Sequence, residues 1–284
     1  MPVHHFLRGE GMNLAYGVTL SAAATAFDRV ANSYDKSFTH TAIGRAQRRQ
    51  VWSRLLAAFA VGSRILELNC GTGEDARFLA NRGRSVLACD ASAAMIEVAK
   101  RGSEHETGHT DLRFLQIANE ELGSLPAEEA FDGAFSNFSG LNCVSDVRPV
   151  ARSLAKLVRP GGSVLLCVWN RVCLAEVIWY LAHGHPKKAV RRFSRKPTAR
   201  LGDAMISVSY RSIREMRRAF WPWFAVSSRR SVGLFVPPSY MERLTGRREN
   251  LLARLEQLDR LLAGWPILRD VGDHVLLEFV RCNL

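Results

Sequence analysis

Several features that define other protein classes are missing from this 284-residue sequence. Its six cysteines form no CxxC pair and have no zinc-ligand spacing, so the sequence predicts neither a metal site nor a disulfide framework. We expect reduced, buried thiols, which are typical of a cytoplasmic protein. No apolar run reaches the roughly 18 residues of a membrane span, and the sequence has no internal repeat. These observations predict a globular protein with one large core and insertions.

The N-terminal region gives the one signal that resembles a leader peptide. The stretch from Leu14 to Phe27 is apolar and rich in small residues, but the segment before it holds Glu10 as well as Arg8 and is not compactly basic. We therefore expect no leader peptide. Residues 1–11 are polar and patternless, and whether they belong to the native chain stays open.

Basic residues exceed acidic ones and give a formal net charge of +12, but the excess is unevenly spread. Residues 187–218 contain eleven basic residues against Asp203 and Glu215, a local excess of +9. Such a run is most often a solvated helix face. It would also suit an anionic substrate, a membrane surface or a nucleic acid. These alternatives stay open.

The chain is organised around residues 65–76, ILELNCGTGEDA, which predict a buried strand, a tight glycine turn and the start of a helix. Gly71 and Gly73 permit backbone angles and a close approach that a side chain would block. Asn69 is one of the few other residues that tolerate a left-handed conformation. At the carboxyl end of a parallel strand, such a turn predicts a nucleotide-type ligand.

Acidic residues near this turn discriminate between ligands. The glycine spacing also satisfies the loose dinucleotide fingerprint, but a pyrophosphate would lie beside Glu67, Glu74 and Asp75. S-adenosylmethionine has no phosphate and carries a sulfonium and an ammonium group, so the same acids favour it. A second strand ends in Asp90, about 20 residues after the glycines, where a carboxylate can bind both ribose hydroxyls.

Four segments in this order resemble the class I S-adenosylmethionine-dependent methyltransferases: LELNCGTGEDARFLA (66–80), VLACDASAAMIEVA (86–99), FDGAFSNFSGLN (131–142) and LAKLVRPGGSVLLCVWN (154–170). The resemblance implies an α/β fold with a doubly wound, mostly parallel seven-stranded sheet, an antiparallel C-terminal strand and helical lid insertions. It implies S-adenosyl-L-methionine as the cofactor. Asn69 departs from the glycine that the family usually has there.

A shorter segment, FDRVANSYD (27–35), resembles the start of the ubiquinone-biosynthesis-like (methyltransferase type 11) group, in which it folds over the cofactor. This implies a site role for Tyr34. The following helix, residues 43–60, carries arginines at positions 45, 48 and 49. We interpret these as its solvated side.

Two strand ends complete the predicted cofactor site. In the family, the residues after the third strand frame the adenine, and Asn119 or Glu120 match that position. Ser136, Asn137 and Phe138 end the fourth strand, where the methyl group is presented. The residues predicted to bind the cofactor are Tyr34, Glu67, Asn69, Cys70, Gly71, Gly73, Asp90, Ala91, Met95, Ala118, Asn119, Glu120, Asn137 and Phe138.

The residues at the end of the same fourth strand argue against one class of methyl acceptor, the nucleic-acid bases. They include no proline-paired loop of the kind that amino-directed base methyltransferases use, and Cys143 follows Asn142 rather than a proline. Methylation of nucleic-acid bases is therefore disfavoured.

We divide the chain into four parts: an N-terminal lid or extension (1–42), a cofactor-binding α/β core (43–170), a helical basic insertion over the substrate (171–206), and a completion of the sheet (207–284) with a helical insertion at 239–270. The aromatic residues of the first insertion and the cluster Trp221-Pro222-Trp223-Phe224 favour a hydrophobic or amphipathic acceptor.

Methyl transfer from a sulfonium needs alignment more than a catalytic triad, and a general base only for a poorly ionised acceptor. His183 and His185 are the base candidates because they lie in the first insertion, whereas we interpret His274, next to Asp273, as structural. The leading hypothesis is methyl transfer to a small molecule. The alternatives are an RNA or protein methyltransferase that uses the basic tract, an NAD(P)-dependent oxidoreductase, and a catalytically silent subunit that binds a partner.

Overall fold

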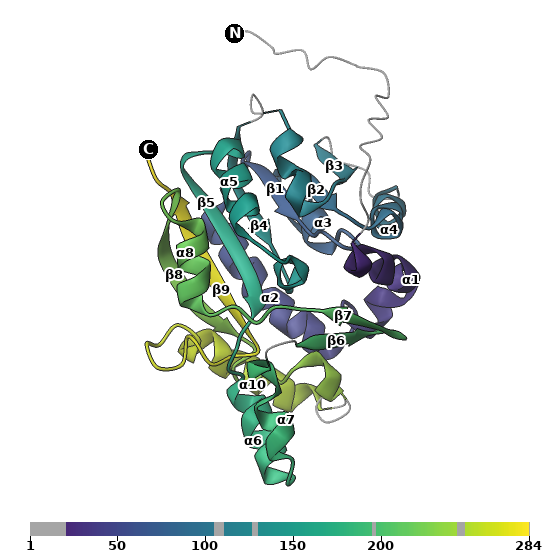
Figure 1. The fold of residues 1–284 in the computed structure, drawn as a ribbon, viewed down its shortest axis with the longest axis vertical. Coiled ribbons are helices and arrows are strands. Elements are labelled where there is room, and N and C mark those ends of the chain that lie inside the picture. The colour runs from purple at the N-terminus through teal and green to yellow at the C-terminus, as the bar shows by residue number, and fades with distance from the viewer. Residues whose placement is uncertain (1–20, 105–110, 127–129, 195–196, 243–247, 284) are drawn as a thin grey trace.

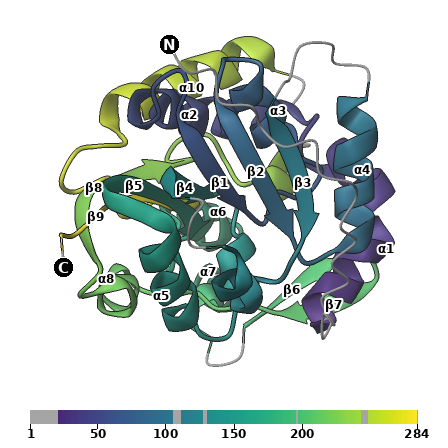
Figure 2. The ribbon, with the colours of Figure 1, turned by 90° about the horizontal axis from the view of Figure 1, so that it is seen from above.

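A seven-stranded sheet with the order β3-β2-β1-β4-β5-β9-β8 forms the centre of the molecule (Figures 1 and 2). The computed structural model describes residues 21–104, 111–126, 130–194, 197–242 and 248–283, so the expectations for residues 1–20 fall outside it. The first five strands are parallel, and β9 is antiparallel to both of its neighbours. The strands are β1 (Arg64–Leu68), β2 (Ser85–Asp90), β3 (Leu112–Gln116), β4 (Phe131–Ser136), β5 (Val158–Trp169), β8 (Phe224–Val232) and β9 (His274–Arg281). The predicted fold class is confirmed.

Helices cover both faces of this sheet because its central strands are apolar on both sides. On one face, α2 and α3 pack through Val51, Leu55 and Leu79 onto β1 and β2. On the other, α5 and α8 pack through Leu154 and Phe220 onto β4, β5 and β9. The bounds are α2 (Ala42–Ala58), α3 (Glu74–Ala80), α4 (Ala93–Ser103), α5 (Arg148–Leu157), α8 (Ile213–Phe220) and the short helices η1 (Asn119–Ser124) and η2 (Gly140–Cys143).

Three further segments lie beyond this core. The helix α1 (Ala22–Ser37) packs on α4 at the carboxyl edge of the parallel strands. The helix α10 (Glu249–Leu262), preceded by η4 (Ser239–Met241), packs on α2. The insertion after β5 contains α6 (Leu174–Ala182), α7 (Pro186–Ala189), η3 (Arg191–Phe193) and the strands β6 (Thr198–Leu201) and β7 (Ala204–Ser207).

The insertion after β5 is only partly helical, which corrects the prediction for residues 171–206. Its second half is a two-stranded antiparallel hairpin, β6–β7, with Gly202 at φ +60° in the turn. Ile206 is buried against Ala26 of α1, so the hairpin packs on the N-terminal helix. The prediction followed the many basic residues of this segment and overlooked its short Gly-Asp turn and the apolar positions beside that turn, which are typical of a hairpin.

None of the helices in the described part of the chain is both long enough and apolar enough to cross a membrane.

Candidate active site

The turn between β1 and α3 has the left-handed geometry that its residue types suggest. Asn69, Gly71 and Gly73 all have positive φ angles, of 56°, 54° and 76°. A Cβ built on Gly73 would lie 2.8 Å from the Phe114 ring and 2.9 Å from Cβ of Ala99. Gly73 is therefore required for close packing under the turn. A Cβ on Gly71 would meet no atom within 4 Å, so at Gly71 a side chain would point into open space.

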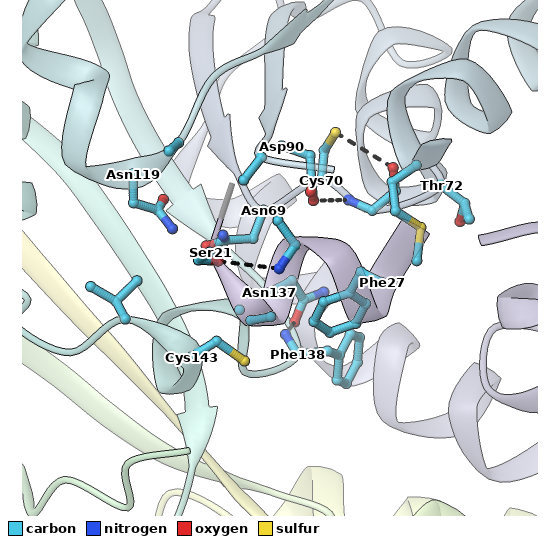
Figure 3. A pocket seen from close by; sticks show the side chains of 18 of the residues that line it. Ser21, Phe27, Asn69, Cys70, Thr72, Asp90, Asn119, Asn137, Phe138 and Cys143 are labelled. Atoms are coloured by element: carbon cyan, nitrogen blue, oxygen red, sulfur yellow. Dashed lines mark hydrogen bonds between the residues drawn. The ribbon is translucent and has the colours of Figure 1, made fainter. Parts of the chain in front are cut away.

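Asp90, at the end of β2, is held in a fixed orientation beside this turn (Figure 3). Its Oδ2 accepts a hydrogen bond from the Gly71 amide at 2.9 Å, and its Oδ1 accepts one from the Ser92 amide at 2.9 Å. Burial raises the pKa of Asp90, while these amide bonds act in the opposite direction. An ionised carboxylate has about four acceptor positions, so both oxygens can still accept from a ligand's hydroxyl pair.

A cavity of about 440 Å³ opens over the ends of β1, β2 and β4. Figure 3 shows Asp90, Cys70 and Asn119 on one side of it and Phe27, Asn137 and Phe138 on the other. We call it the cofactor cavity. The predicted residues that line it are Tyr34, Asn69, Cys70, Gly71, Asp90, Ala91, Met95, Ala118, Asn119, Glu120, Asn137 and Phe138.

Two predicted cofactor residues do not line this cavity. Gly73 serves the packing just described. Glu67 is buried in the sheet, its Oε2 has no hydrogen-bond partner, and burial together with Asp75 raises its pKa well above the ordinary value. Its position in the middle of β1, between two other strands, explains why it is covered.

The acidic residues predicted near the turn are partly neutralised by basic partners. Asp75 lines the cavity, but its Oδ2 forms a 2.6 Å ion pair with Arg48, and both side chains are buried. Asp75 also accepts hydrogen bonds from Trp52 and Asn137, and Glu74 pairs with Arg77 at 2.9 Å.

The interpretation of the α2 arginines as its solvated side is therefore wrong for Arg48, which lines the cofactor cavity. Arg45 is exposed as predicted. Arg49 is half-exposed and pairs with Glu256 at 2.6 Å.

The helix α1 lies against the cofactor cavity and is attached there by the carboxylates of Asp28 and Asp35. Asp28 Oδ1 accepts from the Ser92 hydroxyl at 2.6 Å and from the Ala94 amide at 3.1 Å, at the N-terminus of α4. Asp35 accepts from the Thr72 hydroxyl in the glycine turn at 2.7 Å. These contacts account for both acids of the FDRVANSYD segment.

Between these two acids, Tyr34 lines the cavity. Burial raises its pKa to about 12, so its hydroxyl stays protonated near neutral pH.

A second cavity of about 650 Å³ adjoins the first, and we call it the acceptor cavity. The two share the lining residues Phe27, Tyr34, Phe138, Gly140 and Cys143, so they meet there. Burial raises the pKa of Cys143 to about 11, which makes a thiolate nucleophile at this junction unfavourable. The aromatic residues that line the acceptor cavity are Phe27, Tyr34, Phe38, Phe138, Trp169, Tyr210 and Tyr240.

His274 also lines the acceptor cavity because of the strand directions. It begins β9 and is paired in register with Trp169 at the end of β5. Since β9 is antiparallel, its start lies at the edge where the parallel strands end. The His274 ring contacts Phe138 edge-on, with 5.5 Å between centroids.

Behind His274 lies a buried chain of charges. Asp273 Oδ2 is 3.3 Å from His274 Nδ1, which is close enough for an electrostatic contact but lacks the alignment of a hydrogen bond. Arg192 donates to Asp273 at 2.6 Å and to Glu176 at 2.6 Å. Burial alone would raise the pKa of Asp273, but His274 and Arg192 hold it below its ordinary value.

One cluster has the residue types of a metal site. The ligand atoms of Cys173, Glu176 and Asp273 lie within 4.8 Å of one another. Arg192 bonds to both of these carboxylates and so already supplies the positive charge between them.

The predicted base candidates lie elsewhere. His183 stacks on Trp179 and its Nδ1 bonds to the Trp179 carbonyl on an exposed helix end, and His185 is also exposed. Neither lines the cofactor or the acceptor cavity. Trp221 is exposed and Trp223 packs on the core, so the aromatic cluster used to predict the acceptor does not form its cavity either.

Comparison with known proteins decides the family. The family described as "Methyltransferase domain" matches residues 65–162. The tRNA 5-carboxymethoxyuridine methyltransferase of Escherichia coli (strain K12) is 30% identical over 178 residues, which cover 59% of this chain and 67% of the relative. The chain is a class I S-adenosylmethionine-dependent methyltransferase. The NAD(P) oxidoreductase alternative is therefore dropped.

Other relatives differ in acceptor. The demethylmenaquinone methyltransferase of Clavibacter sepedonicus is 32% identical over 145 residues, which cover 51% of this methyltransferase and 56% of the relative. Among solved structures, a putative S-adenosylmethionine-dependent methyltransferase from Listeria monocytogenes superposes with a TM-score of 0.56 at 17% identity, covering 84% of this chain and 99% of that one. This structural likeness shows the shared fold.

The cofactor cavity fits S-adenosyl-L-methionine in size and in chemistry. Its volume lies within the roughly 300–1,000 Å³ typical of ligand pockets. Asp90 offers acceptors for the ribose hydroxyls, and the open space above Gly71 lets a ligand approach the backbone. Asn119 and Glu120, which follow β3, also line this cavity.

Proposed function

We propose that this methyltransferase transfers a methyl group to a small, largely apolar or amphipathic molecule held in the acceptor cavity. The observation that carries the proposal is an aromatic-walled cavity that meets the cofactor cavity at Phe138, Gly140 and Cys143. In one wall, Trp169 and Tyr210 are stacked with their ring centroids 5.8 Å apart. Aromatic side chains of this kind favour an acceptor that contains a planar ring.

When bound, S-adenosylmethionine supplies a methyl group already activated by its sulfonium sulfur. Asp90 would hold the ribose, and α1 would exclude water from above through Asp28 and Asp35. The aromatic side chains would align the acceptor for in-line attack.

His274 is the side chain that we propose as the general base. It lines the acceptor cavity and contacts Phe138 at the junction, and Asp273 lies behind its Nδ1. Such contacts often tighten only when substrate binds. A base at this place favours an acceptor whose nucleophile carries a proton, such as a phenolic or enolic hydroxyl.

A second candidate is an RNA acceptor. It is favoured by the tRNA-directed relative and by the basic residues of the insertion. That reading requires steep salt dependence of RNA binding.

All six cysteines are free, which supports the expected cytoplasmic, reducing environment.

The test is methyl transfer from tritiated S-adenosylmethionine into two cell fractions, a solvent extract of small molecules and total tRNA. We expect label in an aromatic or apolar small molecule. Label confined to tRNA would replace the proposal by the second candidate.

With the labelled acceptor in hand, His274→Gln should lower kcat by about 100-fold or more, since a positioned base typically contributes about 10²–10⁴. It should also flatten the rise of kcat with pH, while the affinity for S-adenosylhomocysteine stays unchanged. His183→Gln is the matched control and should leave kcat intact. A full rate in His274→Gln would remove the base from the proposal.

A further inference from the structure

The helix α6 has an inverted polarity. Its sequence is LAEVIWYLA, and its one charged residue, Glu176, is 1% exposed. Glu176 is held inward by Arg191 at 2.6 Å and by Arg192 at 2.6 Å. The polar residue therefore faces the protein, and the apolar residues are left for the outside.

The outer face of α6 carries Leu174, Ile178 and Leu181, spaced at i, i+4 and i+7 on one side of the helix. We call these three residues the apolar stripe. Ile178 and Leu181 are 59% and 55% exposed. An exposed apolar surface of this kind marks an interaction site, because water disfavours it.

The charge beside the apolar stripe has one sign. Residues 171–194 contain a single acid, the buried Glu176. Lys187 and Lys188 of α7 are exposed, and only residues 183–185 separate α7 from α6. The tip formed by α6 and α7 is therefore apolar and cationic, which complements an anionic lipid headgroup layer.

The tip projects away from the sheet at the foot of Figure 1. Its C-terminal end leads into the acceptor cavity, which Arg191, Arg192 and Ser194 line. A surface that receives the tip would thus lie close to residues of this cavity.

We propose that the α6–α7 tip docks on the surface of a bilayer that contains anionic lipids. The apolar stripe enters the interface between headgroups and acyl chains, and Lys187 and Lys188 contact the phosphates. The methyltransferase is then placed to take an acceptor that partitions into lipid. This last consequence rests on the proposed function, whereas the docking does not.

Two other occupants fit the tip less well. A nucleic acid would use the lysines but would gain little from Ile178 and Leu181. A second copy of the chain across a twofold axis would bring the same patch onto itself, and so would bring Lys187 and Lys188 toward their equivalents.

The experiment is co-sedimentation of the purified protein with vesicles of phosphatidylcholine and phosphatidylglycerol in equal parts. Ile178→Glu combined with Leu181→Glu should lower the vesicle partition coefficient by about 100-fold or more, since each buried side chain contributes roughly 1.5–3 kcal/mol. Lys187→Ala combined with Lys188→Ala should lower it by about 30-fold, from about 1 kcal/mol per lysine.

The matched control is Leu258→Glu combined with Leu261→Glu, two exposed leucines on α10, which should leave vesicle binding unchanged. Calorimetric titration with S-adenosylhomocysteine verifies the fold of each variant and needs no acceptor, so the docking can fail while the proposed function stands. Unchanged vesicle binding by the stripe variant would overturn the proposal. So would a wild-type dimer in light scattering that the stripe variant abolishes, because the stripe would then bind a second copy.

Discussion

The cofactor cavity and the acceptor cavity lie side by side, but they are built in different ways. The first is formed mainly by the ends of β1, β2, β3 and β4 and by the turns that follow them, and Tyr34 of α1 and Arg48 of α2 complete its lining. Asp90 contacts backbone amides there. The second takes its walls from α1, the end of β5, the insertion and the start of β9. Local sequence therefore places most residues of the first cavity, whereas tertiary packing places those of the second.

The charges differ in the same way. In the cofactor cavity Asp90 bonds to amides, and Asp75 is matched by Arg48. The acceptor cavity combines aromatic side chains with Arg191, Arg192 and Asp273, and Arg192 pairs with Asp273 and with the buried Glu176. We propose that the first cavity holds the cofactor through these fixed contacts and that the second orients an acceptor through its aromatic side chains.

Among the variants considered, Asp90→Ala should cause the largest loss of cofactor affinity. Two charge-assisted bonds to the ribose would be lost, each worth about 1.5–3 kcal/mol. We therefore expect the Kd for S-adenosylhomocysteine to rise by about 10²–10⁴-fold in calorimetric titration. Glu97→Ala, an exposed acid on α4, should bind as the wild type does. Trp169→Ala, on the acceptor side, should also leave the Kd unchanged. If Asp90→Ala and Trp169→Ala raised this Kd to a similar extent, the two cavities would not have the separate roles proposed for them.

Arg48→Ala tests the buried ion pair beneath the cofactor cavity. Removing the guanidinium leaves the Asp75 carboxylate buried and uncompensated, so the free energy of unfolding should fall by about 3–5 kcal/mol. Arg45→Ala, three residues earlier on α2 and exposed, should change it by less than about 0.5 kcal/mol. Urea unfolding of both variants is the measurement, and equal stabilities would show that Asp75 does not depend on Arg48.

A pH series tests the support of the acceptor side. Asp259 holds the amides of Phe235 and Val236, in the segment that leads to Tyr240 of the acceptor cavity. Burial raises the pKa of Asp259 to about 6, although its hydrogen bonds oppose this. The folded form thus favours the proton, and the stability that this proton provides is present below about pH 4 and lost as the pH rises through 6.

The advantage of the wild type over Asp259→Asn in free energy of unfolding should therefore shrink by up to about 3 kcal/mol between pH 4 and pH 7. Unfolding curves at both pH values measure it. If the free energy of unfolding of the wild type, relative to Asp259→Asn, instead rose with pH, the folded protein would favour the ionised form of Asp259.

Asp35→Ala gives the smallest effect, because it removes only the bond from α1 to Thr72. The Kd for S-adenosylhomocysteine should rise by about 10-fold, which corresponds to one hydrogen bond to a charged group. Ser33→Ala, whose hydroxyl bonds within its own helix, should have no effect. If both variants bind equally well, α1 does not stabilise the bound cofactor.

Most of the residues predicted to bind the cofactor line one cavity because strand ends and glycine turns place them locally. Asn69, Gly71 and Asp90 needed only their own strands to be placed. Arg48 was missed although a signal existed: it lies at helical spacing from Val51, Trp52 and Leu55, the apolar face of α2. An arginine on that face needs a buried partner, and Asp75 comes from another helix.

The acceptor side could not be predicted in this way. Trp169 and His274 meet because β9 runs antiparallel and starts where β5 ends, and Tyr210, from the segment between β7 and α8, stacks on Trp169. His183 and His185 were the predicted base candidates because they lie in the first insertion, but the fold directs α6 outward and leaves them exposed. The two-stranded hairpin in that insertion also depends on packing against α1.

A crystal structure with S-adenosylhomocysteine bound would test the central claim most directly. The account predicts the ribose hydroxyls on Asp90 and the sulfur atom at the junction beside Phe138, facing His274 and the acceptor cavity. A ligand bound there with its sulfur turned away from the acceptor cavity, or a ribose that makes no contact with Asp90, would contradict it.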